Sequence, residues 1–289
     1  MRLGFIGIGM MGMPMSRNLL KKSGYPLMVY DVNEEAVKQL ASEGAAAADN
    51  ARQIVENCDV IFTMLPRNEH VRSVYQEIAD GVRPGQIYVE MSTISPEVSR
   101  EMANLVREKG ADLLDAPVVK SRPAAVSGTL GIYVGGRKAT YETVLPLLQC
   151  MGSNIIYLGE NGSGLVMKLC HNLLVAEIQN GVNEVLHLAK AVAGIEPETF
   201  AKAASYGGAQ TFYLDSKAEV LQKGDFTPAF AAEYMHKDLS LAKELCAQAG
   251  LVFDGAETAF RRYEEVMKAG WGKEDFSCTY KLFDDEVQK

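Results

Sequence analysis

A short apolar segment, a glycine-rich turn and a helical segment follow one another at the start of the chain. Residues 2–7 have the length and composition of a buried strand, Gly7, Gly9 and Gly12 have the spacing G-x-G-x-x-G, and residues 13–22 have helical character. In such a unit the first glycine permits the tight turn, the second lets the backbone approach a pyrophosphate, and the third lets the helix pack on the strand. The helix N-terminus then offers free N–H groups to the phosphates. The pattern predicts a dinucleotide-binding unit.

An acidic residue at the end of the next strand-like segment, residues 26–30, supports this interpretation. Asp31 lies 19 residues after Gly12, close to the separation of about 20 residues at which a carboxylate accepts the ribose hydroxyls of NAD. Residues 32–35 contain two glutamates and no arginine, so they would repel the 2′-phosphate of NADP. We therefore expect NAD rather than NADP. A glycine turn in a Rossmann-like domain that binds another ligand is the alternative.

Strand-like and helical segments continue to alternate through the first half of the chain. Helical segments such as 96–109 and 140–150 separate most of the apolar strands. Further strands are expected at 59–65, 86–90, 112–115, 130–134 and 154–158. Alternating strands and helices are typical of a mostly parallel, doubly wound sheet. We expect an α/β Rossmann-like domain over residues 1–162.

Beyond Gly164 the pattern changes to helices alone. Residues 165–193 should form one long interdomain helix, because apolar positions run almost all round it. Shorter helices are expected around 197–205, 209–222, 228–249 and 254–269. We therefore expect an all-α C-terminal domain over residues 163–289.

Composition excludes several classes of function. The chain has 29 Lys and Arg against 37 Asp and Glu, a net charge of −8, which argues against nucleic-acid binding. We expect no membrane-spanning helix, because no apolar run is long enough. The five cysteines contain no C-x-x-C pair and the four histidines are widely separated, so we expect reduced thiols, a cytoplasmic location and no metal site.

Four residues at the start of the long helix are candidates for chemistry. Lys168, His171, Asn172 and Val175 fall on one helical face by their spacing. Removal from water would lower the pKa of a lysine and suit it to proton transfer near neutral pH. The alternative, a lysine that extends from an ordinary helix into solvent, is equally compatible with the sequence.

Several motifs in this order and spacing resemble the β-hydroxyacid dehydrogenase family, which includes 3-hydroxyisobutyrate dehydrogenase and tartronate semialdehyde reductase. The resemblance covers essentially the whole chain. The motifs are F-I-G-I-G-M-M-G-M-P-M at 5–15, T-M-L-P at 63–66, M-S-T at 91–93, D-A-P-V at 115–118, S-G-T-L at 127–130, G-x-G-x-x-x-K at 162–168 and H-K-D-L at 236–239.

The resemblance implies a role for particular residues. Lys168 would be the catalytic acid and base, Asn172 would hold the substrate, and Lys237 would close the site near the nicotinamide. The remaining cofactor contacts implied are Met10, Met11, Asp31, Met64, Leu65, Pro66 and Thr93, beside Gly7, Gly9 and Gly12. The implied reaction is reversible hydride transfer between NADH and a small semialdehyde that bears an acidic group.

The segment after D-A-P-V departs from the family, which usually has Ser-Gly-Gly there. Lys120 and Arg122 bring two cations to this segment, and an extended backbone before Pro123 would place them on one side with Ser121 opposite. Two such cations suit a strongly charged group such as a sulfonate. The segment resembles that of the 3-sulfolactaldehyde reductase branch, whereas a solvated loop is the structural alternative.

His171 is a second departure, because the family commonly has asparagine there. Taken together, the expected substrate contacts are Ser92, Lys120, Ser121, Arg122, His171, Asn172 and Val175.

The leading hypothesis is an NAD-dependent reductase of a small anionic semialdehyde, with 3-sulfolactaldehyde ahead of tartronate semialdehyde and methylmalonate semialdehyde, the latter being the product of a 3-hydroxyisobutyrate dehydrogenase. A non-catalytic NADH-binding protein is the alternative from another class. It would need neither Lys168 nor Asn172 nor Lys237. We also expect a homodimer or homotetramer, from the apolar long helix and the resemblance.

Overall fold

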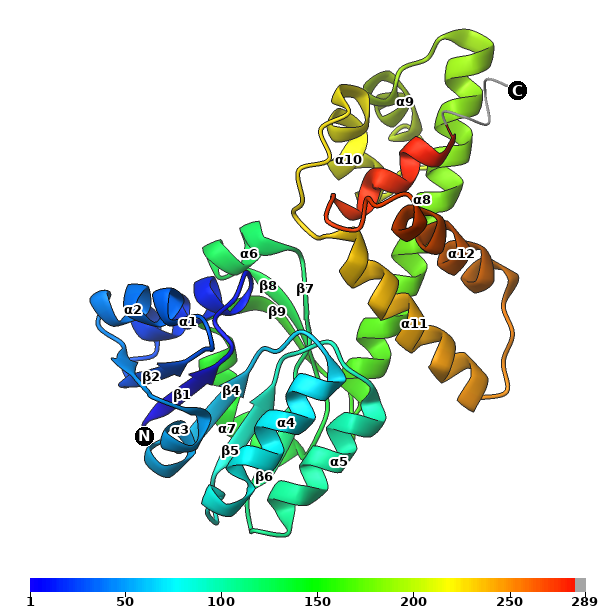
Figure 1. Cartoon of the computed structure of the whole chain (residues 1–289). Helices are drawn as coiled ribbons and strands as arrows, with labels where there is room; N and C mark the ends of the chain where they lie inside the picture. The colour runs from blue at the N-terminus through cyan, green and yellow to red at the C-terminus, as the bar shows by residue number, and fades with distance from the viewer. Residues whose placement is uncertain (284–289) are drawn as a thin grey trace. The chain divides into compact units, whose positions relative to one another are not determined.

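The computed structural model describes residues 1–283 of the chain. Contacts between Cα atoms divide it into two compact units, Met1–Lys168 and a second unit that begins at Leu169. Figure 1 shows the strands gathered in the first unit and helices alone in the second. Each unit is described by itself below.

A six-stranded parallel sheet forms the centre of the first unit (Figure 1). The strands are β1 (Leu3–Ile6), β2 (Leu27–Tyr30), β3 (Ala46–Ala47), β4 (Val60–Thr63), β5 (Ile87–Glu90) and β6 (Asp112–Asp115). Their order is β3-β2-β1-β4-β5-β6, so the chain winds outward in both directions from the boundary between β1 and β4. In sheets of this kind ligands bind beyond the carboxyl ends of the strands at that boundary. The predicted doubly wound α/β fold is confirmed.

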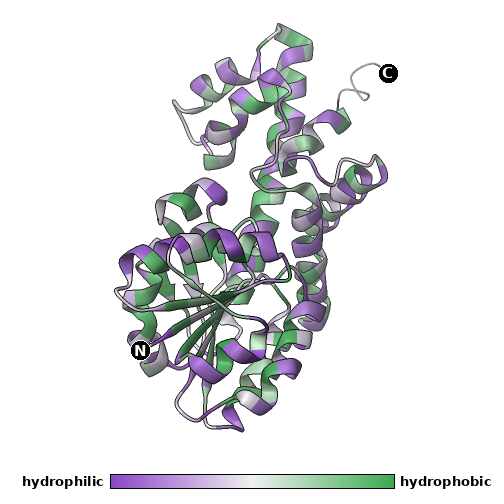
Figure 2. Ribbon diagram, turned by 60° about the vertical axis from the view of Figure 1, so that its left-hand side comes forward, coloured by the Kyte–Doolittle hydropathy of each residue, from purple (hydrophilic) through white to green (hydrophobic). Residues whose placement is uncertain are grey.

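Both faces of the sheet are covered. Phe5 and Phe62 point into a core shared with one set of helices, and their neighbours Ile6 and Ile61 point into a core shared with the other set. This alternation explains why the strands are apolar along most of their length, as Figure 2 shows. The first set is α1 (Gly12–Lys22), α2 (Glu34–Ser42) and α7 (Lys138–Leu148), and the second is α3 (Ala51–Asn57), α4 (Asn68–Ile78) and α5 (Pro96–Arg107).

The predicted strands at 130–134 and 154–158 do not join the main sheet. They form β8 (Leu130–Val134) and β9 (Gly152–Tyr157) of a separate three-stranded sheet, with β7 (Val118–Val119) antiparallel to β8. This second sheet was not predicted. Only two residues separate β6 from β7, and a parallel neighbour would need a crossover of about a dozen residues or more. The chain turns back instead, and a bridge joins Asp115 to Gly135.

The second unit is helical over the residues that the structure describes, as predicted. Its helices are the long α8 (Ser163–Ala193), which begins in the first unit, and α9 (Pro197–Ala204), α10 (Phe212–Lys223), α11 (Ala232–Gln248), α12 (Asp254–Lys268) and the 3₁₀ helix η2 (Phe276–Phe283). Tyr263 and Met235 lie in one buried cluster of this unit, and Tyr213 and Leu186 lie in another. None of the helices within residues 1–283 is both long and apolar enough to cross a membrane.

Candidate active site

The three glycines of the turn between β1 and α1 differ in how much space surrounds them. Gly7 has φ +92°, and a Cβ there would collide with the carbonyl oxygen of Met64. A Cβ on Gly12 would collide with the carbonyl oxygen of Gly7. A Cβ on Gly9, in contrast, would meet no protein atom within 4 Å. The close packing of this unit requires the outer two glycines, whereas the space beside Gly9 is open to a ligand, as the approach of a pyrophosphate requires.

Asp31 is held at the end of β2 by the glycine turn itself. Its Oδ2 accepts the backbone N–H of Ile8 at 2.7 Å, and its Oδ1 accepts that of Asn33 at 2.8 Å. A carboxylate can accept further hydrogen bonds, so ribose hydroxyls fit here. The side chain of Lys38 on α2 pairs with Glu35 at 2.9 Å. Asp31 therefore lies beside the glycine turn, and its contact with the ribose stays a prediction.

Three polar side chains lie in one row across the carboxyl ends of β4, β5 and β6. Thr63 is the register partner of Glu90, and Glu90 is the register partner of Asp115. The Thr63 hydroxyl donates to Glu90 at 2.6 Å, and all three residues are fully buried. Burial raises the pKa of Glu90 to about 7, against opposing hydrogen bonds from Ser92 and Thr63. The carboxyls of Glu90 and Asp115 were not predicted to be part of the site, although each ends a predicted apolar strand.

The side chain of Ser92, an expected substrate contact, is fully buried. Its Oγ accepts the backbone N–H of Leu65 at 2.6 Å. Its own N–H donates to Glu90 at 2.9 Å. This contact joins the segment after β4, with the predicted cofactor contacts Met64, Leu65 and Pro66, to the segment after β5, which includes Thr93.

Asp115 anchors the start of α8. Its Oδ1 accepts the N–H of Gly162 at 2.7 Å, and its Oδ2 accepts the N–H of Leu165 at 2.9 Å. Free N–H groups at a helix N-terminus favour such a carboxylate. A Cβ on Gly164 would approach Asp115 Oδ2 to 2.9 Å, so glycine at 164 makes room for the anchor. Burial raises the pKa of Asp115, and the backbone N–H groups oppose that shift.

Lys168 lies one turn beyond this anchor, still within the first unit. Its side chain is buried, with 8% of the residue exposed. The solvent-extended alternative raised for this lysine is therefore not what the structure shows. A buried amine in this position can take part in proton transfer with a bound molecule.

The segment that carries Lys120 and Arg122 is not extended, so the predicted alternation was wrong. Lys120 has φ +69°, and Arg122 is the first residue of α6 (Arg122–Ser127). Proline is well tolerated in the first turn of a helix, and Pro123 occupies that turn. The amine of Lys120 donates to Asn154 Oδ1 at 2.8 Å and to the carbonyl of Thr129 at 3.2 Å.

In the second unit, Asn172 and Lys237 meet at a carboxylate. The amide of Asn172 donates to Asp238 Oδ2 at 2.6 Å, and Lys237 Nζ lies 3.0 Å from Asp238 Oδ1. Asn172 and Asp238 are both buried. Asp238 was not predicted, although it is the third residue of the H-K-D-L motif. The two other predicted residues on this turn of α8, His171 and Val175, are partly buried.

Comparison with known families identifies the family to which the chain belongs. Residues 2–159 match the family model described as the NAD binding domain of 6-phosphogluconate dehydrogenase. Residues 162–283 match the model described as NAD-binding of NADP-dependent 3-hydroxyisobutyrate dehydrogenase. The chain belongs to the β-hydroxyacid dehydrogenase family. It is therefore an oxidoreductase with a Rossmann domain that binds NAD(P), and the non-catalytic alternative is set aside.

Individual family members match along the whole chain. The NAD-dependent L-serine dehydrogenase of Pseudomonas aeruginosa is 36% identical, with 98% of each chain covered. The 2-(hydroxymethyl)glutarate dehydrogenase of Eubacterium barkeri is 33% identical, over 98% of this chain and 95% of the relative. A solved structure of Mycobacterium tuberculosis 3-hydroxyisobutyrate dehydrogenase with L-serine superposes with a TM-score of 0.91 at 30% identity, over 98% of each chain.

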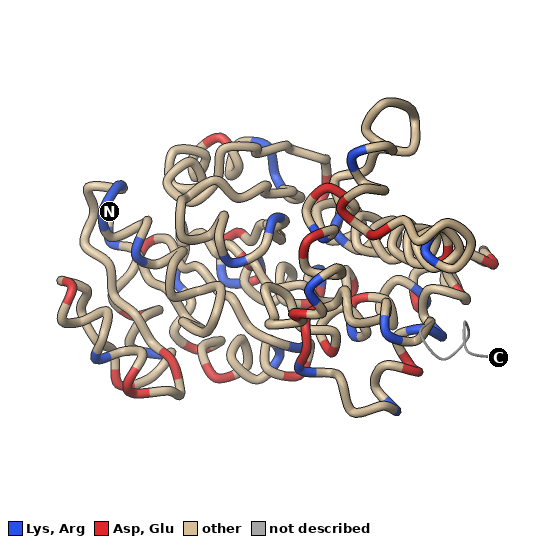
Figure 3. The backbone as a smooth tube through the Cα atoms, turned by 90° about the horizontal axis from the view of Figure 1, so that it is seen from above, with Lys and Arg blue, Asp and Glu red and all other residues tan. Residues whose placement is uncertain are grey.

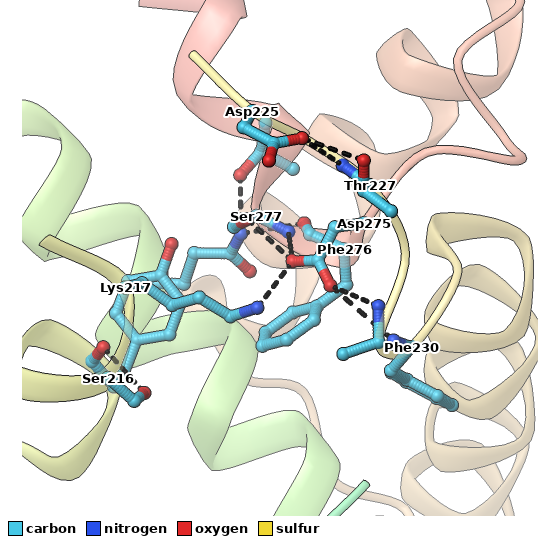
Figure 4. Close-up of polar contacts among 12 residues, drawn as sticks. Ser216, Lys217, Asp225, Thr227, Phe230, Asp275, Phe276 and Ser277 are labelled. Carbon is cyan, nitrogen blue, oxygen red and sulfur yellow. Dashed lines mark hydrogen bonds and ion pairs between the residues drawn. The ribbon is translucent and has the colours of Figure 1, made fainter. Parts of the chain in front are cut away.

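Asp275 is a buried carboxylate in the helical unit of this β-hydroxyacid dehydrogenase, and Figure 4 shows its contacts. Lys217 of α10 approaches Asp275 Oδ1 to 2.7 Å, and the hydroxyl of Ser277 donates to the same oxygen at 2.6 Å. Asp275 Oδ2 accepts the N–H of Ala229 at 3.0 Å. The contacts of this carboxylate join α10, η2 and the segment before α11, so we assign the cluster to the stability of the helical unit.

Charges in the two units of this dehydrogenase are mixed. Figure 3 shows Lys and Arg interspersed with Asp and Glu along the chain. Among residues 1–283, no group of three or more His, Cys, Asp or Glu side chains is placed to hold a metal ion.

Proposed function

We propose that the protein is an NAD-dependent dehydrogenase that interconverts a small anionic semialdehyde and its 3-hydroxy acid. The observation that carries this proposal is the buried amine of Lys168, one turn beyond the helix start that Asp115 anchors to β6. A bound nicotinamide supplies or accepts the hydride. Two relatives are named for L-serine and 2-(hydroxymethyl)glutarate, which both carry a primary alcohol close to a carboxylate.

In this proposal Lys168 moves the proton. In its protonated form it donates to the oxygen of the carbonyl group as that oxygen gains negative charge, and it accepts the proton back in the reverse direction. Asn172 follows one turn later on the same face of α8 and hydrogen-bonds a substrate oxygen. Asp238 supports this role, because it accepts from the Asn172 amide and so fixes which way the amide points.

The preference for NAD over NADP is proposed from the end of β2. The carboxylate of Asp31 is fixed by two backbone N–H groups and has acceptor capacity left for the ribose hydroxyls. Lys38 is the cation of α2 that could neutralise a 2′-phosphate, and Glu35 and Glu34 engage it at 2.9 and 3.6 Å. This arrangement repels a 2′-phosphate and favours NAD.

We propose 3-sulfolactaldehyde as the leading substrate, reduced to 2,3-dihydroxypropane-1-sulfonate. Lys120, Ser121 and Arg122 support this choice, because two cations and a hydroxyl suit a sulfonate with three acceptor oxygens. One observation favours a carboxylate substrate instead. The amine of Lys120 already has two acceptors, Asn154 and Thr129, so tartronate semialdehyde and 3-hydroxyisobutyrate are the second candidates.

A substrate panel with NADH and NADPH tests the proposal. We expect the highest kcat/KM with NADH and 3-sulfolactaldehyde, and lower values with tartronate semialdehyde and methylmalonate semialdehyde. Lys120→Ala and Arg122→Ala should reduce the preference for the sulfonate about tenfold, whereas Arg52→Ala, on the exposed face of α3, should leave it unchanged. An unchanged preference in both variants would remove these cations from recognition.

The homodimer or homotetramer and the cytoplasmic location stay predictions. Sedimentation of the purified protein measures the first, and cell fractionation measures the second.

A further inference from the structure

Glu90 is a fully buried carboxyl at the end of β5 that the proposed reaction does not use. Its Oε2 accepts the hydroxyl of Thr63 at 2.6 Å, and its Oε1 accepts the backbone N–H of Ser92 at 2.9 Å. The hydroxyl of the same Ser92 accepts the N–H of Leu65 at 2.6 Å. Glu90 therefore links the segments that follow β4 and β5.

We propose that Glu90 is a positioning residue. Its carboxyl holds the backbone N–H of Ser92, whose hydroxyl in turn holds Leu65, so that the segments after β4 and β5 keep the conformation that binds the dinucleotide. Because Glu90 has no exposed surface, it acts through Ser92 and not by touching a ligand. The proposal rests on the proposed function and on the cofactor contacts that the family resemblance implies at Met64, Leu65 and Pro66.

The groups that face Glu90 make its charge sensitive to pH. Asp115 faces it from β6 as a second buried carboxyl, and the hydroxyl of Tyr75 on α4 lies 3.4 Å from that of Thr63 on β4. Burial above all, with repulsion from Asp115, raises the pKa of Glu90 to about 7. A charged acceptor makes stronger hydrogen bonds than a neutral one. The hold on Ser92 should therefore strengthen as the pH rises through about 7.

NADH binding by the full chain, followed by NADH fluorescence, tests this proposal. We expect wild-type affinity to rise about fivefold between pH 6 and pH 8, and Glu90→Gln to bind with the same weaker affinity at both. Ser92→Ala should also lose the rise, because it removes the link to Leu65. A wild type without the rise, or variants that keep it, would overturn the role of Glu90. The Ser92→Ala profile decides the question even if Glu90→Gln does not fold.

A double-mutant cycle at pH 8 separates positioning from general destabilisation. If Glu90 acts through Ser92, the double variant should bind NADH no more weakly than the weaker of the two single variants. Additive losses would contradict the proposal. Asp112→Asn is the matched control. Asp112 is also a buried carboxyl, but it begins β6, at the opposite edge of the sheet from Glu90, and pairs with Arg107 at 2.8 Å. It should lower the melting temperature without changing NADH affinity.

The same measurements distinguish this inference from the proposed function. A wild type that binds NADH and reduces a member of the panel, but has the same pH profile as Glu90→Gln, contradicts the role of Glu90 alone. A wild type that binds NADH and reduces no member of the panel contradicts the proposed reaction alone. A wild type that binds no NADH contradicts both.

Discussion

The carboxylate of Asp115 accepts the backbone N–H of Leu165 at 2.9 Å, which ties the end of β6 to the first turn of α8. Lys168 follows Leu165 by three residues, so the anchor and the proposed proton donor are nearly one helical turn apart. Asp115 therefore helps to fix the position of the amine relative to the carboxyl edge of the sheet. Both residues belong to the first unit.

Lys168→Ala should abolish most turnover and preserve cofactor binding. Loss of a general acid typically costs about 10²–10⁴ in kcat, and the NADH contacts proposed here do not include Lys168. Steady-state kinetics and NADH fluorescence measure the two effects. Met167→Ala, at the exposed neighbouring position, is the control and should keep both. Turnover within a few-fold of wild type would show that another group donates the proton.

Asp115→Asn should impair catalysis and stability together. An amide is neutral and has one acceptor oxygen where the carboxylate has two, so one of the N–H groups of Gly162 and Leu165 loses its acceptor and the other keeps only a neutral one. We expect the free energy of unfolding to fall by about 2 kcal/mol and kcat to fall more than NADH affinity. Urea unfolding and kinetics at saturating NADH measure these effects. An unchanged kcat in the folded variant would limit Asp115 to stability.

Asp31→Ser should weaken NADH binding about tenfold, because a charged acceptor of the ribose hydroxyls is lost. Adding Val32→Arg should then improve binding of NADPH, since Val32 is 89% exposed and an arginine there can pair with a 2′-phosphate. The ratio of the dissociation constants for the two cofactors measures the change. A double variant that still prefers NADH as strongly as wild type would place the ribose elsewhere.

The buried pair of Lys217 and Asp275 should contribute strongly to the stability of the helical unit. Asp275→Ala is expected to cost about 3–5 kcal/mol, because it leaves the largely buried Lys217 amine without its partner. Lys243→Ala, which breaks the more exposed pair with Glu257, should cost less than about 1 kcal/mol. Urea unfolding compares the two variants. Equal losses in the free energy of unfolding would show that the burial of the Asp275 pair does not increase its contribution to stability.

Glu90 should make the protein less stable as the pH rises from about 4.5 to about 7. Its pKa is raised from 4.5 to about 7 in the folded chain, so between these values the folded state binds more protons than the unfolded state. The cost is on the order of 3 kcal/mol once the carboxyl is ionised. The gain in free energy of unfolding for Glu90→Gln over wild type should therefore be larger at pH 8 than at pH 5. A pH-independent difference would contradict the raised pKa.

Local patterns predicted much of the fold. Apolar segments bounded by turn residues located β1, β2, β4, β5 and β6, and the loss of strand patterns after Gly164 located the helical region. Gly7 and Gly12 were identified with their reasons, because steric demands in a strand–turn–helix unit are set by neighbours in the chain. The spacing from Gly12 identified Asp31 and helical spacing brought out Lys168, and the resemblance then implied the catalytic role of Lys168.

Tertiary structure alone decided which distant residues meet. The pairing of Thr63, Glu90 and Asp115 in one row depends on strand order and register, which no local pattern specifies. The contact between Asn172 and Asp238 depends on how α8 packs with α11. The contacts of the Lys120 amine with Asn154 and Thr129 likewise join residues that are not neighbours in the chain. Periodicity and turn chemistry act over a few residues, and they determined the elements. Hydrogen bonds between residues far apart in the chain form only once those elements pack. Only the folded structure therefore determined which residues of the site contact one another.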